Sequence, residues 1–212
     1  MNKNGTGNKK KQVFQNSYLE LLTKAPAPVS VTMYLSVIAG LLFYAYQAKV
    51  VPSFGLAATI YVGAVFFWTF FEYFFHKYIN HLDEYFPESK MAHKIAYSLH
   101  GIHHEYPRDK ERLIMPPIPG LLIISILFGI FWLIMGEFLF VFMPGFLTGY
   151  LLYAYVHFSV HKTPVPSYLK VQYKHHAIHH YKYPDKAFGV STTLWDRVFG
   201  TMPPDETANK KN

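Results

Sequence analysis

Long apolar runs without charged side chains constrain the fold of this chain more than any other feature. A transmembrane helix needs about 20 consecutive apolar residues, and runs of that length lie at about 29–47 and 54–75. A third run, 118–155, is too long for one helix and is interrupted near Gly136 and Pro144. We therefore predict two further spans there, at about 119–135 and 138–156. The runs predict an all-α, four-span integral membrane protein.

The composition agrees with a membrane protein and narrows the chemistry. Hydrophobic residues make up 51% of the chain and aromatic residues 18%. The net charge of +7 could indicate a nucleic-acid partner, but no stripe of basic and aromatic residues accompanies it, so we expect none. The chain has no cysteine, which excludes disulfides, thiolate metal sites and iron–sulfur clusters.

The predicted spans divide the chain into three parts. We expect a polar N-terminal tail at 1–28 with a short helix on the membrane surface at 12–24, a membrane domain at 29–204, and a charged tail at 205–212. All 20 Lys and Arg residues except Lys49 lie in 1–28, 76–117 and 157–212. Four spans place these segments on one face, which the positive-inside rule makes cytosolic, together with both termini.

Histidines supply the main functional signal. Ten of the 12 histidines fall into HxxxxH, HxxHH, HxxxH and HxxHH groups, which are His76 and His81; His100, His103 and His104; His157 and His161; and His176, His179 and His180. Imidazole is the commonest protein metal ligand, and helical residues at i, i+3 and i+4 share one face. A single HxxHH is as consistent with a solvated basic patch. The repetition favours a metal site in a helical cap over the cytosolic rim.

The number of histidines indicates two metal ions. One tetrahedral zinc needs three or four ligands, whereas ten suit two ions with roughly five nitrogens each. Zinc, copper, nickel and iron all accept imidazole. Iron is favoured because no water-activating carboxylate is evident for hydrolysis, and because a site at the bilayer rim is placed to oxidise lipid C–H bonds with O2. Purified protein is expected to accept zinc as well.

The order of these motifs, with apolar spans between them, resembles the fatty acid hydroxylase/sterol desaturase superfamily of membrane non-haem di-iron enzymes. Four local sequences are similar to its fatty acid 2-hydroxylase branch: FFHKYINH at 74–81, LHGIHH at 99–104, RLIMPP at 112–117 and GVSTTLWDRVFG at 189–200. The resemblance implies two iron ions, O2 as co-substrate, and hydroxylation at C2 of a fatty acid or a sphingolipid N-acyl chain.

Further residues are candidates for supporting roles in such a site. Residues that bond to the ligating histidines and orient them are expected among Glu72, Asp83, Glu84, His93, His175 and Asp196, and Tyr153, Tyr155 and Trp195 are candidates for lining the lipid path. Placement at the membrane interface is the alternative for Glu72, although a partner of a ligating histidine is favoured. Asp83, Glu84 and Asp196 are each as readily surface carboxylates. His93 and His175 are more simply surface residues or outer partners of the ligands, and an interfacial belt explains the aromatic residues equally well.

The short segment before the first predicted span bears on how electrons reach the site. Many eukaryotic members of the superfamily carry an N-terminal cytochrome b5 domain, whereas about 28 residues precede the first predicted span here. We expect a separate electron donor such as a cytochrome b5, a ferredoxin or a reductase. A sterol or carotenoid hydroxylase or desaturase remains the alternative within the same chemistry. A histidine-rich metal transporter is disfavoured, because transporters need polar ligands near the bilayer midplane.

Overall fold

A computed structural model describes residues 12–204, and within them the chain contains helices and no strands. The all-helical prediction is therefore confirmed for this part of the chain. Residues 1–11 of the expected N-terminal tail and the expected tail at 205–212 lie outside the described residues.

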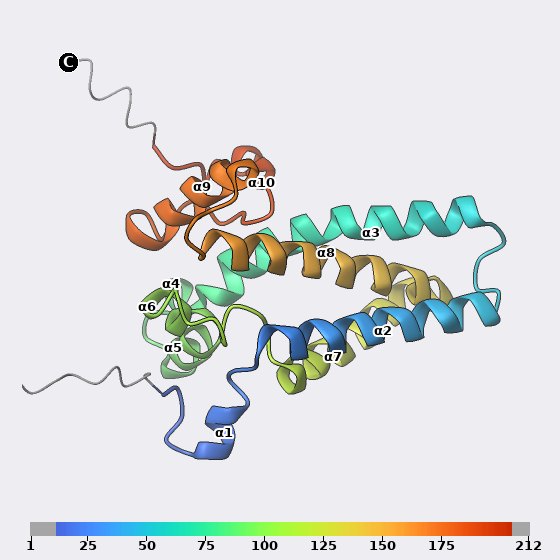
Figure 1. Cartoon of the computed structure of the whole chain (residues 1–212), viewed down its shortest axis with the longest axis horizontal. Helices are drawn as coiled ribbons and strands as arrows, with labels where there is room; N and C mark the ends of the chain where they lie inside the picture. Colours follow the sequence, from blue (N-terminus) through green and yellow to red (C-terminus); the bar gives the residue numbers. More distant parts are fainter. Residues whose placement is uncertain (1–11, 205–212) are drawn as a thin grey trace, which may run out of the picture.

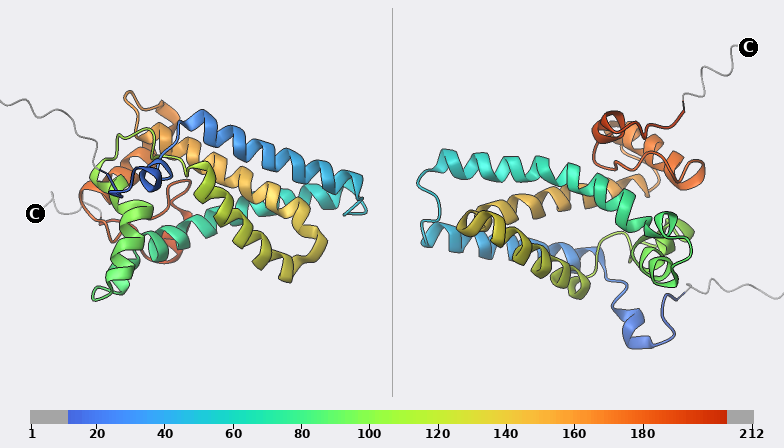
Figure 2. Two further views of the ribbon diagram at one scale, coloured as in Figure 1. Left: turned by 90° about the horizontal axis from the view of Figure 1, so that it is seen from below. Right: turned by 180° about the vertical axis from the view of Figure 1, so that it is seen from behind.

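The longest helices run side by side as a bundle (Figure 1). They are α2 (Ala27–Gln47), α3 (Phe54–Phe74), α7 (Pro117–Met135) and α8 (Leu139–Val160). Three continuous helical stretches are long and apolar enough to cross a membrane: Ala27–Gln47, Phe54–Asn80 and Pro117–Val160. The third consists of α7, the 3-10 turn η3 (Gly136–Phe138) and α8, which form a hairpin (Figure 2). Gly136 permits this reversal with a φ of 55°, a conformation that side-chain-bearing residues disfavour.

Close packing of α3 on α8 forms the centre of the bundle. A Cβ atom on Gly145 would lie 2.3 Å from the backbone oxygen of Tyr61, and one on Gly149 would lie 2.4 Å from the Cβ of Trp68. Glycine is required at both positions because the helices approach so closely there. Phe146 and Tyr150, on the same helix as the glycines, are buried against the Trp68 ring.

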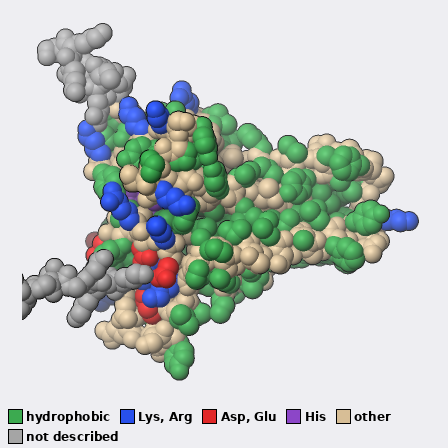
Figure 3. Space-filling model, viewed as in Figure 1, with side chains coloured by type: hydrophobic (Ala, Val, Ile, Leu, Met, Phe, Trp, Pro, Cys, Tyr) green, Lys and Arg blue, Asp and Glu red, His purple; other side chains and the backbone are tan. Residues whose placement is uncertain are grey.

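The shorter helices gather at one end of the bundle, and we call this end the cap (Figure 1). Its elements are α1 (Ser17–Leu21), the π-helix η1 (Phe75–Asn80), α4 (Leu82–Tyr85), α5 (Lys90–Ala96), the π-helix η2 (Tyr97–Gly101), α6 (Ile102–Glu105), the 3-10 turn η4 (Ser167–Leu169), α9 (Lys170–Tyr181) and α10 (Leu194–Val198). The α2–α3 connection lies at the opposite end. Charged side chains concentrate over the cap, whereas the bundle surface is apolar (Figure 3).

The N-terminal helix is shorter than the expected 12–24. The Asn16 side chain caps its start by accepting from the N–H groups of Tyr18 and Leu19, and the helix ends at Leu21. Glu20 turns inward, accepts hydrogen bonds from two backbone N–H groups of residues 13 and 14, and forms a buried ion pair with Arg112. These polar contacts, rather than a longer helix, hold the segment against the cap.

Candidate metal centre

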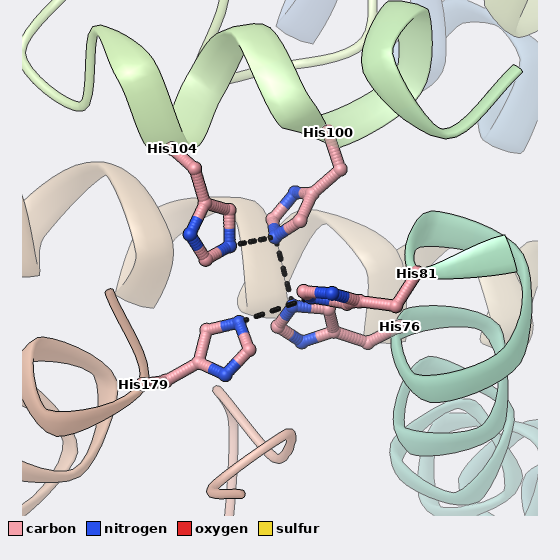
Figure 4. A group of neighbouring side chains, drawn as sticks. All are labelled: His76, His81, His100, His104 and His179. Carbon is pink, nitrogen blue, oxygen red and sulfur yellow. Dashed lines mark hydrogen bonds between the residues drawn. The ribbon is translucent and has the colours of Figure 1, made fainter. Parts of the chain in front are cut away.

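Ten histidines gather where the bundle meets the cap, and the structure sorts them into two groups of five. Within each group, one nitrogen from every ring lies within 4.8 Å of the other four. The first group is His76, His81, His100, His104 and His179 (Figure 4). The second group is His103, His157, His161, His176 and His180.

The two groups are assembled reciprocally. Each takes the histidine pair at the end of one long helix and the first and last histidines of the HxxHH motif that follows it. Each then receives the middle histidine of the other HxxHH motif, so His103 joins the second group and His179 joins the first. On a helix, i and i+4 are about 40° apart, while i+3 lies about 60° to the other side of i. One motif can therefore supply two neighbouring sites.

Two short π-helices place histidines of the first group. His76 lies in η1 and is followed by His81 at its C-cap, and His100 lies in η2. Residues five apart point about 140° away from each other on an α-helix, whereas the i→i+5 repeat of a π-helix brings them onto one side. The wider turn therefore lets an HxxxxH pair converge.

The nitrogen spacing fits bound metal ions. The Nε2 atoms of neighbouring rings are 2.9 Å apart for His76–His100 and His100–His104, and 3.3 Å apart for His81–His179. In the second group the Nε2–Nε2 distances are 3.0 Å for His157–His103, 2.9 Å for His161–His176 and 3.0 Å for His180–His176. Two nitrogens bound at right angles about 2.1 Å from one ion would be about 3.0 Å apart.

The ring tautomers support the same conclusion. His81 donates its Nδ1–H to Glu84 over 3.0 Å, and His179 donates its Nδ1–H to the Lys186 carbonyl over 2.8 Å. In the neutral ring the other nitrogen is then a lone-pair acceptor, so two lone pairs face each other across 3.3 Å. Two acceptors at this distance repel unless a cation lies between them. The donor set therefore fits a metal ion.

Burial keeps the cap histidines neutral and able to bind. Burial, reinforced by neighbouring imidazoles, lowers the pKa of His100, His103, His176 and His179 well below the ordinary value. The same causes lower the pKa of His104 to about 4 and that of His161 to about 3. Metal ligands must be deprotonated, and these rings meet that condition at neutral pH without displacing protons.

A loop at 186–191, which we call the supporting loop, orients two rings of the first group. Its Phe188 carbonyl accepts from His76 Nδ1 over 2.6 Å, and its Lys186 carbonyl accepts from His179 Nδ1. Glu72 on α3 holds the loop by accepting from the N–H groups of Val190 at 2.7 Å and Ser191 at 2.9 Å, and from the Ser191 hydroxyl.

Asp196 holds the supporting loop from the other side. This fully buried carboxylate accepts from the N–H groups of Phe188 at 2.9 Å and Gly189 at 2.8 Å, and from the Thr201 hydroxyl at 2.7 Å. It is also 2.9 Å from His175 Nε2. Glu72 and Asp196 therefore act on the histidines through backbone carbonyls. Among the described residues, no hydrogen bond or ion pair joins either acid to any of the ten. His175 belongs to this support and to neither group of five.

An apolar cavity of about 410 Å³ leads from the histidines into the bundle. Its inner wall includes His76 and His100 of the first group and His103 and His157 of the second. From there it extends between the long helices, where its lining includes Ile123, Ile124, Leu127, Phe146 and Leu147. A long apolar chain in this cavity would present one end to both groups.

Comparison with known proteins identifies the family. The family model described as fatty acid hydroxylase matches residues 61–201, which is more than half of the chain. The chain belongs to the fatty acid hydroxylase family. The resemblance noted in its histidine motifs is thereby confirmed.

Several members of the fatty acid hydroxylase family are similar to this chain. The ceramide very long chain fatty acid hydroxylase SCS7 of Saccharomyces cerevisiae is 36% identical over 73% of this chain and 41% of its own length. The dihydroceramide fatty acyl 2-hydroxylase FAH2 of Arabidopsis thaliana is 32% identical over 94% of this chain and 83% of its own length. The chain spans 41% and 54% of the two fungal relatives. The solved structure of full-length scs7p, with only its hydroxylase domain visible, matches with a TM-score of 0.81 at 32% identity, covering 90% of this chain and 71% of the other.

The aromatic residues predicted to line the lipid path have different environments in this family member. Tyr153 lines the cavity, and its ring stacks on His157 with centroids 5.5 Å apart. Tyr155 is exposed, and its hydroxyl meets that of Tyr168. Two residues along a helix is a rotation of about 200°, which turns Tyr155 away from the cavity. Trp195 donates its Nε1–H to Thr69 over 3.0 Å and does not line the cavity either.

The acids predicted to orient the ligating histidines also differ in their partners. Glu84 contacts one of the ten histidines directly, at 3.0 Å from His81 Nδ1. Asp83 instead pairs with His93 at 3.5 Å on the surface, and His93 also bonds the Pro87 carbonyl. Among the described residues, no hydrogen bond or ion pair joins Asp83 or His93 to any of the ten histidines. Successive residues of the short helix α4 point about 100° apart, so only one of the two acids faces inward.

The RLIMPP segment contains functional groups that the sequence reasoning missed. The Leu113 carbonyl accepts from His157 Nδ1 over 3.2 Å, and Tyr150 accepts from the Met115 N–H over 3.0 Å. Arg112 forms the buried pair with Glu20. Only the resemblance of the hexapeptide to the family pointed to this segment, because backbone acceptors have no side-chain signature.

Proposed function

We propose that this protein is a membrane di-iron monooxygenase that hydroxylates a lipid acyl chain, at C2 of a fatty acid or of a sphingolipid N-acyl chain. The balanced reaction is R–H + O2 + 2e⁻ + 2H⁺ → R–OH + H2O. The electrons come from a donor such as a cytochrome b5, a ferredoxin or a reductase. The named activities of the fungal and plant relatives support this proposal.

One observation carries the proposal more than any other. The cavity has two histidines from each group in its wall, and most of the other lining side chains, in the bundle and in the adjoining cap, are apolar. A substrate in it would therefore be an apolar chain whose reacting carbon reaches both groups. Cavities of this size and polarity are typical ligand sites.

The ten histidines would hold two iron ions, five rings to each group. Bound there, iron would supply the activation of O2 that an unactivated C–H bond requires. The protein's own contribution is orientation. The supporting loop, held by Glu72 and Asp196, keeps the rings of His76 and His179 in one tautomer and direction. Such outer partners commonly change metal affinity or activity 10–100-fold.

The topology in the proposal has four spans: α2, α3, α7 and α8. All basic residues except Lys49 lie in the described cap or in the terminal segments, and Lys49 follows α2 at the far end of the bundle. The positive-inside rule then puts the cap, the histidines and both termini in the cytosol. This orientation places the histidine end of the cavity at the cytosolic rim of the bilayer.

The position of the cavity accounts for oxidation near the head group. A lipid that enters from the bilayer keeps its polar head at the rim and its tail among α2, α3, α7 and α8. The carbon beside the histidines is then close to the head group, which favours C2 over positions deep in the tail. Apolar walls hold the chain and exclude water from the reacting carbon.

Lipid mass spectrometry tests the proposal. Cells that co-express the protein with a b5-type donor and its reductase should accumulate 2-hydroxy acyl chains, free or amide-linked, whose hydroxyl oxygen derives from labelled O2. The matched control is His103→Ala, which should form none. Mid-chain hydroxylation, a new double bond without a hydroxyl, or a hydroxylated sterol or carotenoid would contradict the C2 assignment.

A further inference from the structure

A second, smaller pocket, lined partly by exposed side chains of α9 and of the residues after α8, reaches the second histidine group. It has a volume of about 170 Å³, and its wall includes His161, His176 and His180. No histidine of the first group lines it. The second group is therefore approached from two sides, by the apolar cavity through His103 and His157 and by this pocket through the other three rings.

The charged side chains that line this pocket are both cations. Arg108 and Lys162 line the pocket itself, and Lys170, Lys174 and Lys182 lie on or just after α9, all of them exposed. The sequence contains no Asp or Glu between positions 138 and 184. We call these five cations the basic face.

The other half of the cap differs in charge. Asp83, Glu84, Glu88, Glu105, Asp109 and Glu111 all lie between α4 and the start of α7. On the visible side of the molecule, red side chains appear near α4 and α6 but not around α9, where blue ones dominate (Figure 3). Basic residues occur in both halves of the cap, as a membrane-topology bias predicts. The asymmetry is that acids balance them in the half from α4 to α7 and not around α9, and a topology bias does not account for this difference.

We infer that the basic face is the docking surface for an acidic one-electron carrier protein, and that electrons enter the centre at the second group. This inference rests on the proposed function, which requires two electrons per turnover. Electron-transfer partners form small, transient interfaces, and complementary charge accelerates such encounters. Exposed rings of Tyr173 and Tyr181 at the pocket supply apolar contact area within the basic face.

A charge-reversal experiment on the full-length protein in nanodiscs tests the inference. The probe is the soluble haem domain of a b5-type cytochrome, whose binding and oxidation are followed separately. Arg108→Glu combined with Lys162→Glu should raise the Kd for the probe at least tenfold at low salt. The matched control, Lys90→Glu with Lys94→Glu, makes the same charge change on α5 and should leave the Kd within twofold. The Kd of the wild type for the probe should rise with salt concentration. The Kd of the Arg108/Lys162 variant should depend on salt concentration much less.

Two further measurements keep the result unambiguous. Turnover with dithionite and a small mediator should be unchanged in the Arg108/Lys162 variant, which excludes misfolding. Acidic residues of the probe changed to lysine should restore binding to that variant. Equal Kd values for both double variants would overturn the inference. An effect present in nanodiscs of anionic lipid and lost in zwitterionic ones would also overturn it, since the face would then bind the membrane. Normal probe binding without hydroxylated product would contradict the proposed function instead.

Discussion

The two histidine groups are built from the same parts but are supported unequally. In the first group, His76, His81 and His179 donate Nδ1–H to acceptors of the protein: the Phe188 carbonyl, Glu84 and the Lys186 carbonyl. In the second group His157 donates to the Leu113 carbonyl. The Nδ1 atoms of His103, His176 and His180 are buried without a partner among the described residues.

The two histidine groups also differ in the pockets that lead to them. The second group lines the smaller pocket, whose wall includes exposed side chains, and the first group does not. The first group thus combines fixed ring orientations with seclusion, while the second is less constrained and more accessible. Identical ligand sets can therefore give metal sites of different lability, because the surroundings of the rings set their orientation and contact with solvent.

Reciprocal assembly ties the two groups together despite this difference. His103 and His179 each leave their own motif to complete the opposite group. Neither group is complete unless both halves of the cap are in place. Because each half of the cap gives one histidine to the opposite group, substitution of that histidine tests how the two groups depend on each other.

The largest effect is expected from removing a crossing histidine. His179→Ala should lower the metal content of the first group, and His103→Ala that of the second, and each should reduce product formation at least 100-fold because both groups face one substrate cavity. Elemental analysis and lipid mass spectrometry measure the two effects. His93→Ala, which alters a surface histidine paired with Asp83, is the control and should retain most activity. Unchanged metal content in both crossing variants would contradict the reciprocal assignment.

Removing the buried carboxylate of the supporting loop should have the next largest effect. Asp196→Ala leaves the N–H groups of Phe188 and Gly189 without their acceptor, and an unsatisfied buried group costs about 1–3 kcal/mol. The variant should unfold at a clearly lower temperature and bind metal less tightly in the first group than in the second. Thermal unfolding measures the stability of the variant, and metal titration measures its affinity for metal.

Asp185→Ala changes an exposed neighbouring acid and should match the wild type. Equal loss of affinity in both groups would show that the loop does not act on the first group alone.

Some of this arrangement could be predicted from the sequence, because histidine carries its chemistry in its side chain. The spacing of the ten histidines was enough to single them out, and the apolar runs predicted an all-helical chain. The sorting of each HxxHH motif between two groups could not be predicted, since it depends on helix rotation and on the π-helices η1 and η2.

Backbone groups account for most of what the sequence does not reveal. The carbonyls of Leu113, Lys186 and Phe188 orient ligand rings, and any residue type could supply them. The acids that hold the supporting loop were identified as candidates near the ligands, but their action through the loop required its conformation. Likewise, Tyr153 and Tyr155 have the same side chain, and only the rotation of α8 separates a cavity residue from a surface one.

Chelation should resolve the two groups by rate. Treatment with excess EDTA should remove metal in two phases, the faster at least tenfold quicker than the slower, because the second group lines the smaller pocket beside exposed side chains and its rings are less fixed. Metal release is followed by elemental analysis of timed samples. His161→Ala should abolish the fast phase, and His81→Ala should abolish the slow one. A single phase, or the reverse assignment, would mean that ring support and access do not control lability here.

The smallest expected effect comes from Glu84, an acid that contacts one of the ten histidines directly. Glu84 is 3.0 Å from His81 Nδ1, but its side chain is 41% exposed, so water can replace much of what the carboxylate provides. Glu84→Gln keeps an oxygen that can accept the hydrogen bond and loses only the charge. We expect a decrease of about 3- to 10-fold in metal affinity, at the low end of effects for outer partners, confined to the slow-release metal of the first group. Competition with a coloured chelator measures the affinity.

Glu88→Gln removes the same charge from an exposed position that contacts none of the ten histidines and should leave both affinities unchanged. If Glu84→Gln also weakened the second group, the two sites would be coupled through more than the crossing histidines, and the unequal support of the groups would not act on each separately.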